Sequence, residues 1–278
     1  MIEKIYIVRH GFRLNWVNTN WTSPTGLPRD PPLAAHGEAE AKEFAQHILS
    51  LPEEEKPTAI FSSPYYRCLQ TSQPAAQALK LPLYVEHGLS EWYSPVALGT
   101  GLHPRPASTS SLKRWFQEID PAGWSTTWYP SRRGEGVEEI HDRADGYLSV
   151  FIPHVERVYP QHKVIMLVSH AGPIIAFARS LVGDRNLPIR VGCCSLTEFV
   201  RKQGEDWKVI GGWEAKKLAD GAHLKNGASR EWGFEDIEIA NGKVVEDKGE
   251  ANFSGEEDQP VGSQVPDTLV SISIPTRM

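Results

Sequence analysis

Short apolar runs alternate with amphipathic segments along residues 1–213. Apolar runs with β-branched and aromatic residues are typical of buried strands, and they occupy residues 5–8, 58–61, 83–85 and 164–168. Apolar positions that recur every three or four residues predict helices over 37–50, 65–79, 137–158 and 173–181. This alternation predicts an α/β fold, with a three-layer, mostly parallel sheet and helices on both faces.

The pattern also predicts how the rest of the chain is organised. Residues 195–200 and 207–213 predict a closing antiparallel pair, and together they end a domain over residues 1–213. Residues 94–136 are rich in Pro, Gly, Ser and Trp, which predicts an insertion over the sheet with one short helix at 111–118. We expect a C-terminal extension over 214–278.

Within this extension, residues 246–259 are acidic and polar, which predicts a disordered linker. Residues 269–274 alternate as a strand would, so this segment either adds to a sheet edge of this chain or of a protein partner, or remains a disordered tail.

Composition excludes several classes of function. The formal net charge is -6 and no Lys/Arg-rich block stands out, so we expect no direct nucleic-acid binding. The three cysteines form no C-x-x-C pair, which argues against a disulfide framework and a cysteine-based zinc site. Neither a membrane-spanning run nor a signal-peptide pattern is visible, so we expect an intracellular protein of the nucleus, the cytoplasm or both, without membrane contact.

Polar side chains follow the predicted strands at the point where each strand ends. The carboxyl ends of parallel strands lie along one edge of a sheet, so residues far apart in sequence converge there. The residues concerned are Arg9, His10, Arg67, Glu91 and His170. Guanidinium groups bind phosphate oxygens, a histidine can accept a phosphoryl group, and a carboxylic acid can protonate the leaving oxygen and then activate water. This inventory suits phosphoryl transfer without a metal or other cofactor.

The same residues lie in motifs that resemble the histidine phosphatase superfamily, which has the phosphoglycerate mutase-like fold. In chain order the motifs are Arg9-His10-Gly11, Pro32-Leu33 ahead of Gly37, Ser62-Ser63-Pro64 with Arg67 and Thr71, Glu91, and Ser169-His170-Ala171-Gly172. The resemblance implies that His10 becomes phosphohistidine, with Glu91 as proton donor. It also implies a phosphate pocket formed by Arg9, Arg67 and His170. Neighbouring arginines would lower the pKa of His10 and keep it neutral for attack.

Within the superfamily, the Arg-His-Gly-x-Arg form makes the chain more similar to tyrosine- and steroid-phosphate phosphatases than to glycolytic mutases. Arg13, the second arginine of that form, is a further candidate for phosphate binding. The likeness is greatest to the histidine-phosphatase subunits of the fungal RNA polymerase III transcription factor TFIIIC and their free-standing relatives. It covers residues 9–16, 64–69, 91–93, 195–196 and 232–234.

Three functions remain open at this stage. The first is a metal-independent phosphomonoesterase acting through phospho-His10 on a small molecule or a phosphoprotein. The second is a TFIIIC subunit that uses the fold as a scaffold and docks a protein partner through the C-terminal segment. The third is a phosphomutase, in which Arg13, Arg132 or Arg133 would hold a second charged group of the substrate. Tryptophans and tyrosines in loops 14–32 and 94–136 favour an aromatic or otherwise apolar leaving group.

Overall fold

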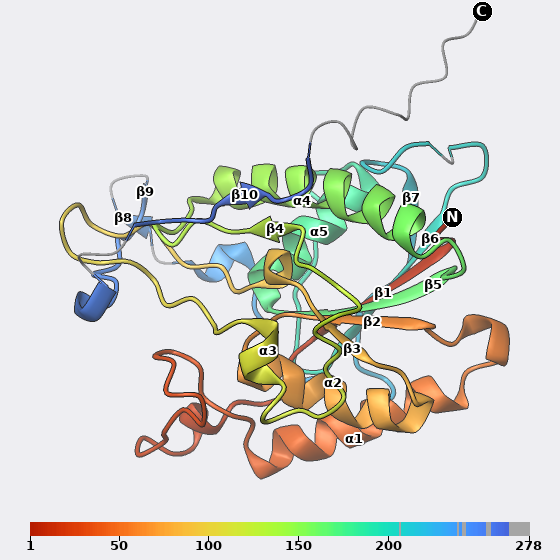
Figure 1. Cartoon of the computed structure of the whole chain (residues 1–278), viewed down its shortest axis with the longest axis horizontal. Coiled ribbons are helices and arrows are strands. Elements are labelled where there is room, and N and C mark those ends of the chain that lie inside the picture. The colour runs from red at the N-terminus through yellow and green to blue at the C-terminus, as the bar shows by residue number, and fades with distance from the viewer. Residues whose placement is uncertain (206, 238, 241–242, 254–256, 267–278) are drawn as a thin grey trace, which may run out of the picture.

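The protein is built around one six-stranded sheet, seen in a computed structural model (Figure 1) that describes residues 1–266 except 206, 238, 241–242 and 254–256. The strand order is β3-β2-β5-β1-β6-β7. The strands are β1 (Lys4–Arg9), β2 (Ala59–Ser62), β3 (Leu83–Val85), β5 (Val164–Ser169), β6 (Leu196–Arg201) and β7 (Trp213–Asp220). The first four in spatial order run parallel, while β6 and β7 pair antiparallel, which confirms the predicted mostly parallel sheet.

Helices cover both faces of this sheet. Helices α1 (Ala35–Ser50) and α2 (Tyr66–Leu79) lie on one face, and α4 (Val137–Val158) and α5 (Ala171–Val182) lie on the other (Figure 1). Alternate residues of β1 pack into the two resulting cores, with Ile5 and Ile7 on the α4–α5 side and Tyr6 and Val8 on the α1–α2 side. A strand buried on both faces needs an unbroken apolar run, which is why the pattern was readable from the sequence.

Short elements connect these layers. They are η1 (Leu14–Trp16), η2 (Glu53–Glu55), η3 (His87–Leu89), α3 (Thr109–Leu112), β4 (Trp128–Tyr129), η4 (Phe234–Asp236), β8 (Ile239–Ala240), β9 (Lys243–Val244), η5 (Ala251–Phe253) and β10 (Gly262–Ser263). The short helix expected at 111–118 is α3, which begins two residues earlier and ends at Leu112. Among the described residues, no helix is both long enough and apolar enough to cross a membrane.

The closing strand pair differs from the prediction. The second strand of the pair was expected over 207–213, but β7 begins only at Trp213 and continues to Asp220. Gly211 adopts φ 75°, and a Cβ on Gly212 would lie 2.1 Å from the carbonyl oxygen of Lys208. These glycines therefore form a turn rather than a strand. The sheet extends beyond residue 213, although the domain boundary expected there stays a prediction.

The acidic segment 246–259 was expected to be disordered, and its described residues contradict this. Asp247 and Glu250 form backbone bridges with Val96 and Leu102 of the insertion. Farther along, β10 pairs antiparallel with β4. Composition misled the prediction because the acidic side chains have arginine partners in distant loops, which offset the cost of ordering the segment. The strand expected at 269–274 lies outside the described residues.

Candidate active site

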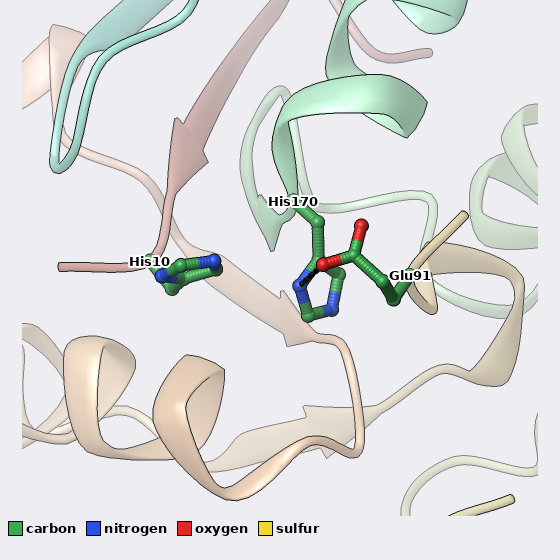
Figure 2. A group of neighbouring side chains, drawn as sticks. All are labelled: His10, Glu91 and His170. Carbon is green, nitrogen blue, oxygen red and sulfur yellow. Dashed lines mark ion pairs between the residues drawn. The ribbon is translucent and has the colours of Figure 1, made fainter. Parts of the chain in front are cut away.

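Three titratable side chains meet at the carboxyl edge of the parallel strands. His10 follows β1, His170 lies between β5 and α5, and Glu91 follows η3 (Figure 2). One ligand atom from each lies within 4.8 Å of the others. The ring centroids of the two histidines are 5.3 Å apart, in an edge-to-face arrangement. The sheet topology therefore brings together residues that are far apart in the sequence.

His10 is held in a neutral state with a free lone pair on Nε2. Its Nδ1 lies 2.8 Å from the carbonyl oxygen of Gly11. A carbonyl can only accept, so Nδ1 carries the proton and Nε2 keeps its lone pair. The backbone amide of Gly11 donates to Thr71 Oγ1 at 3.0 Å, which fixes this turn. Burial, followed by the positive charges of Arg67 and Arg9, lowers the pKa of His10 well below its usual value.

Arg67, in the first turn of α2, is fully buried and joins two parts of the site. Its Nη1 donates to Asp30 Oδ1 at 2.9 Å, and its Nη2 lies 3.0 Å from Glu91 Oε2 and 3.1 Å from His170 Nδ1. Asp30 also accepts from the backbone amide of Tyr66 at 2.7 Å. Asp30 was not predicted as a site residue, because only the aromatic residues of loop 14–32 drew attention to that region.

Glu91 is ionised in the free protein. Burial alone would raise the pKa of Glu91, but the interactions with His170, Arg67 and Arg13 outweigh it and hold this pKa well below the usual range. Burial lowers the pKa of His170 to about 4, although Glu91 opposes this shift. His170 is thus uncharged at neutral pH, and the two arginines stabilise the Glu91 anion. Because Arg67 can only donate to Nδ1, the His170 proton is on Nε2, which lies 2.8 Å from Ser63 Oγ.

Two further arginines reach the site from β1 and the following loop. Arg9 Nη1 donates to the carbonyl oxygens of Val191, at 2.6 Å, and Arg230, at 2.5 Å. The guanidinium of Arg13 lies 4.3 Å from the ring centroid of Trp16. Burial, with repulsion from other arginines, lowers the pKa of Arg13 to about 10, so it stays charged at neutral pH. Among the described residues no carboxylate lies within ion-pair distance of Arg13, although the charge of Glu91 acts on it.

These groups line a cavity of about 200 Å³ that is suited to an anion. Its walls are Arg9, His10, Arg13, Glu91, Trp92, Ala171, Gly172 and Trp232. Arg67 does not line it and reaches the site through its contacts with Glu91 and His170. The first residues of α5 form part of the wall, and a helix N-terminus favours negative charge.

An aromatic wall separates this cavity from a neighbouring one. The rings of Trp92 and Trp232 have centroids 6.0 Å apart. On their other side lies a cavity of about 320 Å³, which Ile237 and Val245 help to line. Trp232 stands in one of the segments that carry the family likeness, but it was not predicted as part of the site. The backbone bridge between Trp232 and Val191, which carries it there, has no local sequence signal.

Two residues proposed for a mutase are not brought to the cavity. Arg132 Nε donates to the carbonyl oxygen of His103, and Arg133 lines a separate cavity of about 390 Å³. Their expected role in holding a second charged group of the substrate therefore has no geometric support.

The same three ligand atoms that meet at the sheet edge could, by distance alone, hold a cation. Histidine nitrogens and a carboxylate are common metal ligands. However, Arg9, Arg13 and Arg67 surround this set, and their positive charges oppose binding of a cation. The charge balance favours an anion such as phosphate.

Comparison with known proteins identifies a matching superfamily and similar individual proteins. The sequence model of the histidine phosphatase superfamily (branch 1) matches residues 5–211. The transcription factor tau 55 kDa subunit of Saccharomyces cerevisiae is 39% identical over 210 residues, which cover 72% of this chain and 47% of that protein. The ecdysteroid-phosphate phosphatase of Drosophila melanogaster is 24% identical over 250 residues, which cover 75% of this chain and 32% of that protein. The chain thus spans less than half the length of these relatives.

Solved structures show the same fold. An ecdysone phosphate phosphatase from Bombix mori, in complex with tungstate, aligns with a TM-score of 0.56 at 14% identity, covering 78% of this chain and 93% of that one. A mycobacterial glucosyl-3-phosphoglycerate phosphatase aligns with a TM-score of 0.52 at 18% identity, covering 78% of this chain and 98% of that one. These likenesses confirm the predicted phosphoglycerate mutase-like fold.

Proposed function

The chain belongs to branch 1 of the histidine phosphatase superfamily, and we propose that it is a metal-independent phosphomonoesterase that forms a phosphohistidine on His10. The observation that carries the proposal is the buried His10 ring, which is kept neutral beside three arginines and faces His170 and Glu91. A nucleophile, an anion pocket and a carboxyl group are the parts that a covalent phosphoryl transfer needs.

In the first step, the arginines and the N-terminus of α5 bind the phosphate group. The lone pair of His10 Nε2 forms a bond to phosphorus while the bond to the leaving oxygen breaks. The leaving oxygen takes a proton from Glu91. Glu91 is ionised in the free protein, so it must gain this proton with the substrate. A bound phosphate raises the pKa of Glu91 by like-charge repulsion and by competing for Arg13 and Arg67.

In the second step, water attacks phosphorus and the bond to His10 breaks. Glu91, now ionised, accepts the proton of the attacking water, and His10 returns to its neutral form with a free lone pair on Nε2. The hydrogen bond between His170 Nε2 and Ser63 keeps the Nδ1 of His170 directed at Arg67 and Glu91.

The wall of the cavity favours an aromatic or otherwise apolar leaving group, on a small molecule or a phosphoprotein. Trp92 and Trp232 offer flat apolar surface next to His10 and Glu91. Arg133 lines a different cavity, which counts against its use in the mutase alternative, whereas Arg132 lines a small cavity that Glu91 also lines.

A test compares hydrolysis of p-nitrophenyl phosphate by the wild type and by His10→Ala. Removing the nucleophile should lower kcat by several orders of magnitude, because it abolishes the covalent route. His162→Ala is the matched control, since this half-buried histidine lies at the other end of β5 and should leave kcat unchanged. Acid-labile phosphate should be trapped on the wild type after rapid quenching and not on His10→Ala. Equal rates for the wild type and His10→Ala would refute the mechanism.

The second candidate is a scaffold subunit of a transcription complex. The likeness to the transcription factor tau 55 kDa subunit, at 39% identity, favours it. In this case the protein would be nuclear and would dock a protein partner through its C-terminal segment, without binding nucleic acid directly. A chain that ends after Pro266 retains the described part of the extension, so it isolates the last residues. Affinity purification of the full and the shortened chain should show a partner that only the full chain retains, and identical partner sets would count against docking there.

A further inference from the structure

Arg67, which the proposed function assigns to phosphate binding, is paired with an acid that comes from a distant loop. Asp30 and Arg67 each have a side-chain exposure of 1%, and their ion pair is 2.9 Å long. Without Asp30, a fully buried guanidinium would lose one of its two carboxylate partners. Breaking such a pair leaves an uncompensated buried charge, which moves to find a new partner. Asp30 thereby determines where Nη2 of Arg67 points.

The loop that carries Asp30 is held in an uncommon backbone conformation. Arg29 has φ 61°, in the left-handed region that residues other than glycine rarely adopt. In this conformation both the carbonyl oxygen of Arg29 and the carboxylate of Asp30 accept from Nη1 of Arg67, at 3.3 and 2.9 Å. Rotation of Arg29 to an ordinary conformation would move both acceptors.

The side chain of Arg29 is fixed by the C-terminal extension. Its Nη1 and Nη2 each lie 2.8 Å from an oxygen of Asp247, and its Nε lies 2.7 Å from Glu250 Oε1. Bidentate pairs of this kind fix geometry as well as contributing energy. A Cβ on Gly249 would lie 2.9 Å from the backbone of Gly101, so the extension also packs tightly on the insertion. We call Arg29, Asp247 and Glu250 the latch.

We propose that Asp30 is a positioning residue for Arg67, and that the latch couples the C-terminal extension to the oxyanion affinity of the active site. This inference rests on the proposed function, since it assigns Arg67 to phosphate binding. The family match ends at residue 211, so the acidic side of the latch lies in the part of the chain beyond it. The extension thereby gains a role in the chemistry of a site that it does not line with these residues.

The experiment measures tungstate binding by isothermal titration calorimetry, together with kcat/KM for p-nitrophenyl phosphate, on the full chain. Asp30→Asn can accept from Arg67 or from the amide of Tyr66 but not from both. We expect tungstate affinity and kcat/KM to fall by about 10-fold to 100-fold, as for other small misplacements of a binding group. In an Arg67→Met background, Asp30→Asn should lower neither tungstate affinity nor kcat/KM any further, because Asp30 would have no arginine to position.

The latch is tested at residues that are less buried than Asp30, so folding is less at risk. Asp247→Asn/Glu250→Gln should weaken tungstate binding by about 3-fold to 10-fold. The matched control is Asp142→Asn/Asp145→Asn, which removes two carboxylates that face Arg185. This control should bind tungstate as the wild type does, and circular dichroism checks that every variant is folded.

Two results would overturn the inference alone: wild-type tungstate affinity in folded Asp30→Asn, or an equal loss from Asp30→Asn with and without Arg67. Latch variants with the same tungstate affinity as the wild type would overturn the proposed coupling between the extension and the active site. A wild-type protein that neither binds tungstate nor hydrolyses the ester would overturn the proposed function, and the inference with it.

Discussion

The carboxylate of Glu91 lies 3.2 Å from Nδ1 of His170, and in the view of Figure 2 His170 lies between Glu91 and His10. Because His170 is neutral at neutral pH, this contact is not a fixed ion pair. Glu91 can therefore gain and lose a proton without breaking a salt bridge to the histidine. Its interactions with His170, Arg67 and Arg13 keep it ionised until an anion binds.

Glu91→Gln should slow phosphoryl transfer to a degree that depends on the leaving group. An amide cannot donate the proton that an alkoxide needs, whereas p-nitrophenolate leaves without one. We expect the rate of phosphohistidine formation to fall by about 100-fold to 1,000-fold for glycerol phosphate and by less than about 10-fold for p-nitrophenyl phosphate. Rapid-quench measurement of the first turnover separates this step from hydrolysis of the intermediate. An equal loss for both esters would remove Glu91 from the role of acid.

Arg13→Gln should raise the pKa of His10. Arg13 is one of the positive charges that disfavour the protonated ring, so its removal favours the imidazolium form. His10 must be neutral to attack, and activity is lost as the pH falls through its pKa. The acid limb of the pH profile of kcat/KM should therefore move to higher pH.

Arg114→Gln controls for the change of net charge, because Arg114 is exposed and stacks on Trp115. An acid limb that stays in place in Arg13→Gln, or one that moves equally in Arg114→Gln, would contradict a local electrostatic effect of Arg13 on His10.

Most of the sheet and the main helices could be predicted, because a buried strand or helix face requires a recognisable pattern of apolar residues in the local sequence. Every residue of β5 is buried, and α4 has the bounds that its periodicity predicts. The convergence of His10, Glu91 and His170 also followed from strand order, since parallel strands place their carboxyl ends together. The roles assigned to these residues stay predictions that the experiments above test.

The loops could not be predicted because their order comes from partners that are distant in the chain. Arg29 and Asp247 are separated by 218 positions, and neither lies in a periodic segment. An acidic, polar segment has the same composition whether or not distant arginines pair with its carboxylates, so composition alone does not predict whether it is ordered. For the same reason Asp30 and Trp232 were not identified as parts of the site.

Trp232→Ala should change which esters the protein prefers. The indole of Trp232 lines the cavity beside Trp92, so an aryl leaving group would lose a stacking surface worth about 1 kcal/mol. We expect kcat/KM to fall by about 5-fold to 10-fold for p-nitrophenyl phosphate. It should change little for glycerol phosphate, which has no ring to stack. Trp207→Ala is the matched control, since this side chain is 74% exposed. An equal loss for both esters would indicate a structural role instead.

His87→Gln should make the free energy of unfolding depend less steeply on pH under acidic conditions. His87 is buried in η3 and has no partner for Nδ1 among the described residues. Burial, followed by repulsion from Arg105, lowers the pKa of His87 to about 3 from the usual value of 6.5. At pH values above 6.5 both the folded and the unfolded chain hold this ring neutral. Below pH 6.5 the His87 ring binds a proton in the unfolded chain but not in the folded chain. The free energy of unfolding therefore decreases as the pH falls.

Urea denaturation of the wild type and of His87→Gln measures this difference. Glutamine does not titrate, so between about pH 6.5 and about pH 5 the variant should lose about 2 kcal/mol less of its free energy of unfolding than the wild type does. Any pH-independent cost of the substitution cancels, because each protein is compared with itself. The other buried groups titrate in both proteins and cancel likewise. Parallel pH dependences for the two proteins would mean that His87 binds its proton equally well in the folded and unfolded chains.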